Sequence, residues 1–295
     1  MARRQIIDAH HHLWDLDHGY AYSWLQDKPN GEGMLGNLAS IATTYLPADY
    51  LADSSNYDVM KSVHIEAVPL DPLAESRWLT GLGTALPTGI VGHIDLEAPD
   101  AEAIITAHAA FPAMRGIRQI VNWHTNAAVT FNPRDLLADR AWQRGYALLR
   151  KYNLSFDMQL YAGQMGEAYD LARRHPDTLI VVNHAGMPVD RDPDGIAQWH
   201  EGMRTLARAG NVVAKISGLG MVDHAWTIDS IRPFVLGTID AFGTERTMFG
   251  SNFPVDKLYS SFDRLYSAFE TIIAGFSDAE QDRLFRANAE RWYRL

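Results

Sequence analysis

Eight short apolar segments, each with the length of a buried β-strand, limit the fold of this chain more than any other feature. The expected strands cover Ile6–His12, Ser62–Ala67, Gly89–Leu96, Gly116–Asn122, Leu154–Leu160, Leu179–His184, Val212–Ser217 and Thr247–Asn252. Amphipathic helices are predicted at Asp100–Ala110, Asp139–Tyr152, Gln164–His175, Ile196–Ala209, Ser230–Phe242, Phe262–Ala274 and after Ser277. Strands that alternate with helices in this way predict an α/β fold, a (β/α)8 TIM barrel.

The length of 295 residues and the hydrophobic content of 47% suit a single domain over residues 1–295. An open doubly wound sheet is the alternative, but it favours a glycine-rich turn after the first strand, where this chain has histidines. The segment from Leu13 to about Asp58 is too long for an ordinary loop after a strand. It is rich in aromatic residues and contains a predicted turn at Pro29–Gly31. We expect this long loop to cover the active site or to pack as a surface excursion.

The composition excludes several classes of function. The net charge of −10 argues against nucleic acid or an anionic membrane as the partner. No apolar run approaches the ~20 residues needed to span a bilayer, and the first residues do not resemble a signal peptide. The absence of cysteine excludes disulfides, thiolate catalysis and cysteine-ligated zinc. A cytoplasmic protein that binds a small molecule is expected, and a homo-oligomer is compatible with the sequence.

Polar side chains gather on one face of the expected strands, mostly near their carboxyl ends. Barrel interiors normally hold branched apolar side chains, and each unpaired buried polar group costs about 1–3 kcal/mol. One buried His or Lys is more often structural than catalytic, whereas a set at one barrel mouth predicts an active site. The set comprises Asp8, His10, His12, His64, Glu66, His93, Asp95, Arg118, Asp157, Gln159, His184, Lys215, Ser217 and Asn252.

Two histidines end the first expected strand. His10 and His12 are two residues apart, so their side chains should point to the same face, together with Asp8. Two imidazoles in this arrangement can bind one metal ion or one carbonyl oxygen. The intervening His11 should face the outside of the barrel.

Six short sequence motifs resemble those of a known family. They are His10-x-His12, Arg115–Arg118, Asn183–Pro188, Lys215–Gly218, Phe249–Pro254 and, in the last helix, Phe285-x-x-Asn288-Ala289-x-Arg291-x-Tyr293. Over nearly its whole length the chain resembles the amidohydrolase-related TIM-barrel hydrolases, in the branch that contains sugar-acid lactonases and 2-pyrone-4,6-dicarboxylate lactonase.

The resemblance implies an enzyme, a hydrolase that opens a small lactone, or a related ester or amide, at the carboxyl end of the barrel. It also implies that His10, His12 and His184 could hold one divalent metal such as zinc, together with an aspartate from strand eight. Members of the lactonase branch do not always require metal. In those members the histidines polarise the carbonyl directly and the aspartate activates water.

The chain departs from this family at Asn252, where that aspartate is expected. A neutral amide is not basic enough to take a proton from water, although its oxygen could weakly bind a metal. Either the catalytic base lies elsewhere or the protein is not a hydrolase of the usual type. The candidates for a relocated base are Glu66, Asp256 and His184.

Further residues are predicted to bind the substrate. The guanidinium of Arg118 could bind a substrate carboxylate, and Lys215 could stabilise a developing oxyanion. An ion pair with Glu66 is the structural alternative for both. Asp157 and Gln159, on the expected inward face of strand five, complete the predicted substrate-binding set.

The leading interpretation is ring-opening hydrolysis of a small carboxylated lactone, in which His10 and His12 polarise the carbonyl. One alternative is a metal-dependent non-oxidative decarboxylase. The other is a ligand-binding homologue that has lost catalysis because Asn252 replaces the acid.

Overall fold

Eight parallel strands form a nearly closed barrel in the computed structural model, which describes residues 3–27 and 33–295. The strands, hydrogen-bonded in chain order, are β1 (Gln5–His11), β2 (Asp58–Ile65), β3 (Gly89–His93), β4 (Met114–Ile120), β5 (Ser155–Gln159), β6 (Ile180–Val182), β7 (Val212–Ile216) and β8 (Thr247–Phe249). The predicted (β/α)8 barrel is confirmed. The predicted turn at Pro29–Gly31 lies outside the described residues.

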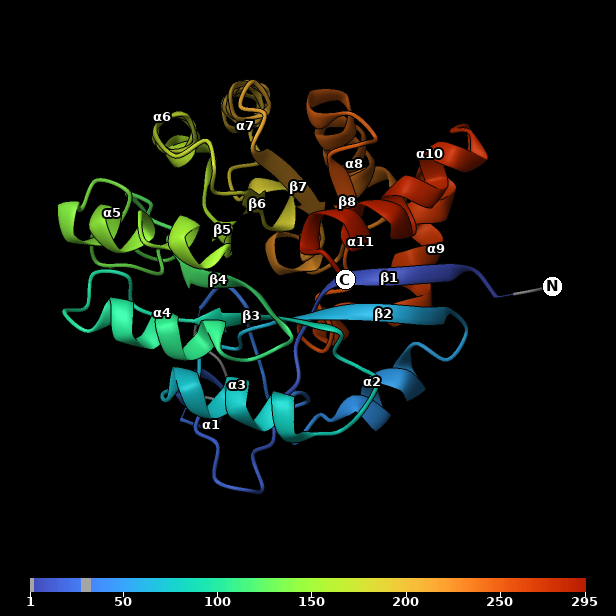
Figure 1. The fold of residues 1–295 in the computed structure, drawn as a ribbon. Helices are drawn as coiled ribbons and strands as arrows, with labels where there is room; N and C mark the ends of the chain where they lie inside the picture. Colours follow the sequence, from blue (N-terminus) through green and yellow to red (C-terminus); the bar gives the residue numbers. More distant parts are fainter. Residues whose placement is uncertain (1–2, 28–32) are drawn as a thin grey trace.

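Helices surround the ring of strands (Figure 1). They are α1 (Ser23–Gln26), α2 (Pro47–Asp53), α3 (Pro72–Gly81), α4 (Ala101–Ala109), α5 (Arg140–Tyr146), α6 (Met165–Arg174), α7 (Pro193–Ala207), α8 (Ile228–Phe242), α9 (Phe262–Ile272), α10 (Asp278–Asp282) and α11 (Asn288–Tyr293). The helices α4 to α9 were predicted, as was the last helical region with its capping box at Ser277. The short or weakly amphipathic α1, α2 and α3 were not. No helix in the described residues is long and apolar enough to cross a membrane.

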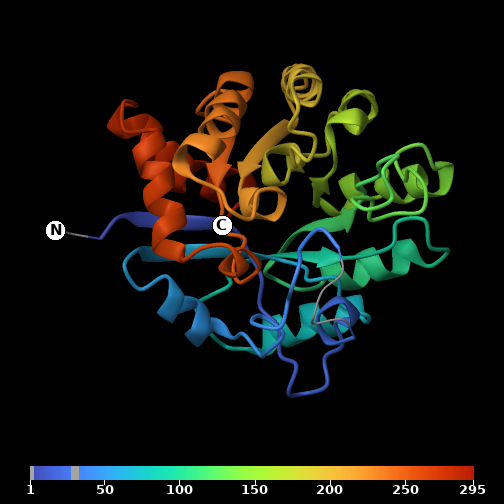
Figure 2. The ribbon, with the colours of Figure 1, turned by 180° about the vertical axis from the view of Figure 1, so that it is seen from behind.

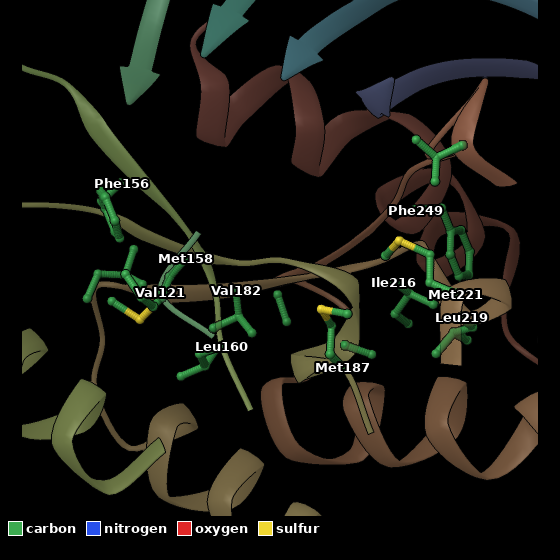
Figure 3. Packing of buried hydrophobic residues seen from close by; sticks show 14 of the residues in the cluster. Val121, Phe156, Met158, Leu160, Val182, Met187, Ile216, Leu219, Met221 and Phe249 are labelled. Atoms are coloured by element: carbon green, nitrogen blue, oxygen red, sulfur yellow. The ribbon is translucent and has the colours of Figure 1, made fainter. Parts of the chain in front are cut away.

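Apolar side chains form two cores, one inside the barrel and one between the strands and the helices. The inner core contains Ile7, Ala9, Val63, Ile65, Val91, Val181, Val213, Met248, Ala289 and Tyr293. Figure 3 shows part of the outer core, to which Phe156 and Met158 of β5 belong. Because side chains alternate along a strand, the outward direction of these two residues turns Asp157 and Gln159 into the barrel.

The last helix closes the amino end of the barrel. In Figure 1, α11 lies over the ring of strands near β1 and β8. Tyr293 reaches into the inner core and donates a hydrogen bond of 2.7 Å to Asp157 Oδ1. Asn288 donates to the backbone carbonyls of Thr244 and Thr247. The last-helix phrase found in the sequence therefore belongs to the barrel itself.

The barrel closes through the residues that follow β8. The backbone N–H of Asn252 donates to the carbonyl of His10, and the N–H of His12 donates to the carbonyl of Phe253, each at 2.7 Å. Gly250 permits this approach, since a Cβ at its position would lie 2.7 Å from the Cβ of His10. Asn252 is thereby fixed beside both histidines, at a φ of 57° that asparagine tolerates better than most residues.

The described residues of the long segment between β1 and β2 lie over the carboxyl end of the barrel, and Figure 2 shows them in blue in front of the strands. Trp14 pairs with Tyr45 in an antiparallel bridge, and both rings are buried. Trp24 and Leu35 from the same segment line a cavity at the strand ends. Both expectations for this segment are therefore met: it is packed by its own aromatic residues and it covers the candidate site.

Candidate active site

A cavity of about 350 Å³ lies at the carboxyl ends of the strands. The predicted site residues that line it are His12, Arg118, Gln159, His184 and Asn252. The predicted residues His10, Glu66, Asp157, Lys215 and Asp256 are buried and do not line it. The rest of the lining comprises Trp24, Leu35, Ala67, Val68, His93, Asp95, Gln119, Ile120, Phe131, Asn132, Met221 and Val255.

An irregularity in β1 sets the direction of the two histidines. Ala9 belongs to the inner core, so Asp8 faces the outer side, where it accepts a hydrogen bond of 2.8 Å from Tyr50. The register of β1 shifts after Asp8, and this shift returns His10 to the inside of the barrel. The expectation that Asp8 shares a face with the two histidines was wrong, because the shift breaks the regular alternation.

The protonation of His12 is fixed by its surroundings. Its Nδ1 lies 2.7 Å from the carbonyl oxygen of Ile65, which can only accept, so Nδ1 carries the proton. Burial lowers the pKa of His12 to about 3, so the ring is neutral and Nε2 is an unprotonated acceptor. That Nε2 lies 3.3 Å from Nε2 of His10 and 3.2 Å from Oδ1 of Asn252. A neutral His12 in this tautomer cannot donate to a substrate carbonyl.

These distances fit a bound cation. Ligands at about 2.0–2.1 Å around a tetrahedral zinc lie about 3.3 Å from one another, which matches both contacts of His12 Nε2. Asn252 Oδ1 and His12 Nε2 are both acceptors, and a shared cation would stabilise their contact. In the described part of the chain, no group of three or more His, Cys, Asp or Glu is arranged to hold a metal, so the third ligand here would be the neutral amide.

His184 stands beside this pair, with its ring centre 4.5 Å from that of His10. Its Nδ1 lies 2.9 Å from Ser217 Oγ. Burial, followed by the charges of Arg118 and Lys215, holds the pKa of His184 well below its usual value, so the ring is neutral. Gly218 makes room for it: a Cβ there would overlap the imidazole, and its φ of 61° favours glycine.

Glu66 is held in an ion pair. Its Oε1 accepts from Arg118 Nε at 2.5 Å, and its Oε2 lies 3.2 Å from His93 Nδ1 and accepts from Val68 N at 2.6 Å. Burial alone would raise the pKa of Glu66, but Arg118 and His93 outweigh it and hold that pKa well below the usual range. The ion pair with Arg118, considered from the sequence as the structural alternative, is present. Arg118 also donates to Gln159 at 3.3 Å.

Lys215 and Asp157 form a second ion pair under the floor of the cavity, with Nζ 2.5 Å from Oδ1 and both side chains fully buried. Asp157 also accepts from Asn183 at 3.1 Å and from Tyr293 at 2.7 Å. Burial lowers the pKa of Lys215 to about 8 against the opposing effect of Asp157. These two predicted substrate-binding residues are thus placed with the inner core, apart from the cavity wall formed by Arg118 and Gln159.

Asp256 lies behind Asn252. Its backbone N–H donates to the Asn252 carbonyl at 3.0 Å, and its side chain is 1% exposed. Burial raises the pKa of Asp256 to about 7, against the lowering effects of the Asn252 amide and the backbone N–H groups of Gly220 and Gly218. The carboxyl group therefore contacts the residue that replaces the expected acid, and the cavity lies on the other side of that residue.

Replacing Asp256 with Asn should remove a pH dependence of stability. The folded pKa near 7 exceeds the ordinary value of 3.8, so the protonated carboxyl stabilises the fold at low pH and this contribution is lost as pH rises through about 7. Relative to the variant, the wild type should lose roughly 3 kcal/mol of unfolding free energy between about pH 5 and pH 8. Urea unfolding at several pH values measures this, and parallel curves for the two proteins would contradict it.

Comparison with known proteins places the chain in a family. The sequence profile described as Amidohydrolase matches residues 7–295, and the chain belongs to this family of hydrolases. It is 45% identical to an uncharacterized protein of Sinorhizobium fredii, over 98% of both chains. It is 29% identical to an L-fucono-1,5-lactonase of Burkholderia multivorans, over 98% of this chain and 96% of that one. A crystal structure of an amidohydrolase from B. multivorans with bound zinc covers 100% of both chains at 27% identity, with a TM-score of 0.82.

Proposed function

We propose that this hydrolase opens a small lactone in the cavity at the carboxyl end of the barrel. One observation supports the proposal most: the unprotonated Nε2 of His12 lies 3.3 Å from Nε2 of His10 and 3.2 Å from Asn252 Oδ1, at the wall of the cavity. The name of the B. multivorans relative supports a lactone as the substrate class.

A divalent cation such as zinc would be held by His10 and His12, with the Asn252 oxygen as a neutral ligand. When bound, it would supply Lewis-acid polarisation of the lactone carbonyl. The chain itself prepares the site, because the Ile65 carbonyl keeps the proton of His12 on Nδ1 and so keeps Nε2 available. Asp256, whose backbone N–H donates to the Asn252 carbonyl and whose pKa the Asn252 side chain lowers, is assigned to holding Asn252 in place.

His184 is the proposed proton carrier, because it is neutral and lines the cavity. As the oxygen of water adds to the lactone carbonyl carbon, His184 takes a proton from that water. The bond between the carbonyl carbon and the ring oxygen then breaks, and the proton passes to the ring oxygen to give a hydroxy acid. The lowered pKa makes the buried ring a weaker base than a free imidazole and, once protonated, a stronger acid that returns the proton readily to the ring oxygen.

Arg118 and Gln159 are proposed to bind a carboxylate on the substrate. Both line the cavity, and the hydrogen bond between them keeps the guanidinium oriented. Glu66 holds Arg118 from below, so we assign it to positioning and leave the proton transfer to His184.

The experiment that tests this function combines metal analysis with a lactone assay. The purified protein should contain about one divalent cation, and its removal by a chelator should lower the rate of lactone opening by about 10²-fold or more, with recovery on addition of zinc. Unfolding curves before and after chelation control for loss of the fold. Full activity in the metal-free protein would contradict the proposed role of a cation in polarising the lactone carbonyl. Release of CO2 from aromatic acids without lactone opening would support the decarboxylase alternative.

A further inference from the structure

We infer that His93 determines the selectivity of this site for anionic over neutral lactones, by forming with Arg118 the wall that binds a substrate carboxylate. This inference rests on the proposed lactone hydrolysis and adds a residue to it. His93 was on the expected inward face of strand three, but a lone histidine there has a structural explanation, so the sequence alone did not single it out.

Neighbouring strands bring the three charged groups of this wall together. His93 of β3 is the register partner of Arg118 of β4, and each cation contacts one oxygen of the same carboxylate, Glu66. Glu66 is fully buried beneath them, whereas the side chain of His93 is 15% exposed and lines the cavity. The cavity therefore meets the cationic side of the cluster and not its carboxylate.

The net charge of the cluster formed by Glu66, Arg118 and His93 depends on whether His93 is protonated. Glu66 carries one negative charge and Arg118 one positive charge, so this pair alone is neutral. A protonated His93 gives these three groups a net charge of +1, and the exposed carboxylate of Asp95, 3.7 Å from His93 Nε2, is the acidic group beside them at the cavity wall. A carboxylate placed there would receive charge-assisted hydrogen bonds from both cations, whereas a neutral substrate group would gain much less.

The surroundings of His93 favour its cationic form. Burial lowers its pKa, but Glu66 outweighs burial, and Asp95 and Glu75 add to the rise, so the net pKa is raised. His108 of α4 contacts the His93 carbonyl at 2.9 Å, and burial lowers its own pKa to about 4, so it adds no charge. Asp95 lies 3.7 Å from His93 Nε2 on a side chain that is 66% exposed, where solvent weakens its competition for the imidazolium.

The space in front of His93 can accommodate such a group. His93, Asp95, Trp24 and Val68 line both the main cavity and an adjoining one of about 540 Å³. A substituent attached to the lactone ring can therefore extend past His93 while the ring stays beside His12. The substrate class that follows is a lactone with a carboxylate on or next to its ring.

Binding of two lactam isosteres tests the inference without turnover. Pyroglutamate carries a carboxylate next to a five-membered lactam ring, and pyroglutamamide is its neutral counterpart. Calorimetry on the wild-type protein should show about tenfold tighter binding of pyroglutamate at about pH 6, with the preference falling toward about pH 9 as His93 loses its proton. His93→Gln should reduce the preference several-fold and abolish its pH dependence.

A matched control is His124→Gln, because His124 also pairs with a carboxylate, Asp190, at 3.1 Å but lies outside the cavity lining. It should leave the preference unchanged. Equal affinities for the two lactams, an unchanged preference in His93→Gln, or no binding of pyroglutamate at millimolar concentrations would overturn the inference. Lactone opening by the wild type is assayed separately, so the binding test can fail while the proposed hydrolysis stands, and the two failures are distinguishable.

Discussion

Replacement of His12 by Ala is expected to lower the rate of lactone opening by about 10³-fold or more while the protein stays folded. The substitution removes a ring nitrogen that combines a fixed tautomer, set by the Ile65 carbonyl, with close contacts to both His10 and Asn252. His10→Ala should have a similar effect, because it removes the other half of the 3.3 Å pair. Initial rates with a panel of small lactones measure both effects, and metal content measures the loss of a ligand.

His11 provides the control for this experiment. It lies between the two histidines in sequence but contacts Ser62 Oγ at 2.9 Å and stacks on Tyr50, away from the cavity. His11→Gln should therefore lower the free energy of unfolding and leave the rate per folded molecule within a few-fold of wild type. Lactone opening at the wild-type rate in His12→Ala would end the proposal that this pair forms the reaction centre.

The sequence predicts the barrel and the neighbourhood of the site because both depend on local patterns. Each strand shows its apolar length, and polar residues such as Arg118 and His184 fall near strand ends in the sequence itself. The last-helix phrase also indicates an element that closes the barrel through Tyr293.

The direction, tautomer and ionisation of the site's side chains depend on contacts between residues far apart in the sequence, which a local pattern does not reveal. The register shift of β1 follows Asp8, so Asp8 stays on the outer face while His10 is brought to the inner one. The tautomer of His12 follows from a carbonyl 53 residues away in the chain. Glu66 is an attractive base by position alone, and only the placement of Arg118 and His93 on its two oxygens shows that it is held as an ionised partner.

The same dependence explains why Asn252 is easier to understand in the structure than in the sequence. As a replacement for an acid it suggests lost catalysis. In the fold, its backbone joins β8 to β1 and its side chain lies between His12 and the buried Asp256. The buried carboxyl group near the site is therefore that of Asp256, which lies behind the Asn252 amide. Asn252 itself contacts His12 and carries no charge.

Replacement of Lys215 by Met should destabilise the protein by about 3–5 kcal/mol, since it leaves the carboxylate of Asp157 buried without its cation. Both side chains are fully buried, and Asp157 keeps only its hydrogen bonds from Tyr293 and Asn183. The double variant Lys215→Met with Asp157→Asn should regain much of this loss, because the amide is neutral and can still accept from Tyr293. Urea unfolding of the wild type, both single variants and the double variant measures the coupling.

The same set of variants also distinguishes a structural role of Lys215 from a role in stabilising the oxyanion. A residue under the floor of the cavity should affect stability strongly and kcat only weakly, within about tenfold, when rates are measured on fully folded protein. A residue that touches the oxyanion, as the sequence suggested, would instead lower kcat in the stable double variant as much as in Lys215→Met. A kcat close to that of the wild type in both Lys215→Met and the double variant would assign Lys215 to the core, whereas an equally low kcat in the two variants would assign it to the reaction.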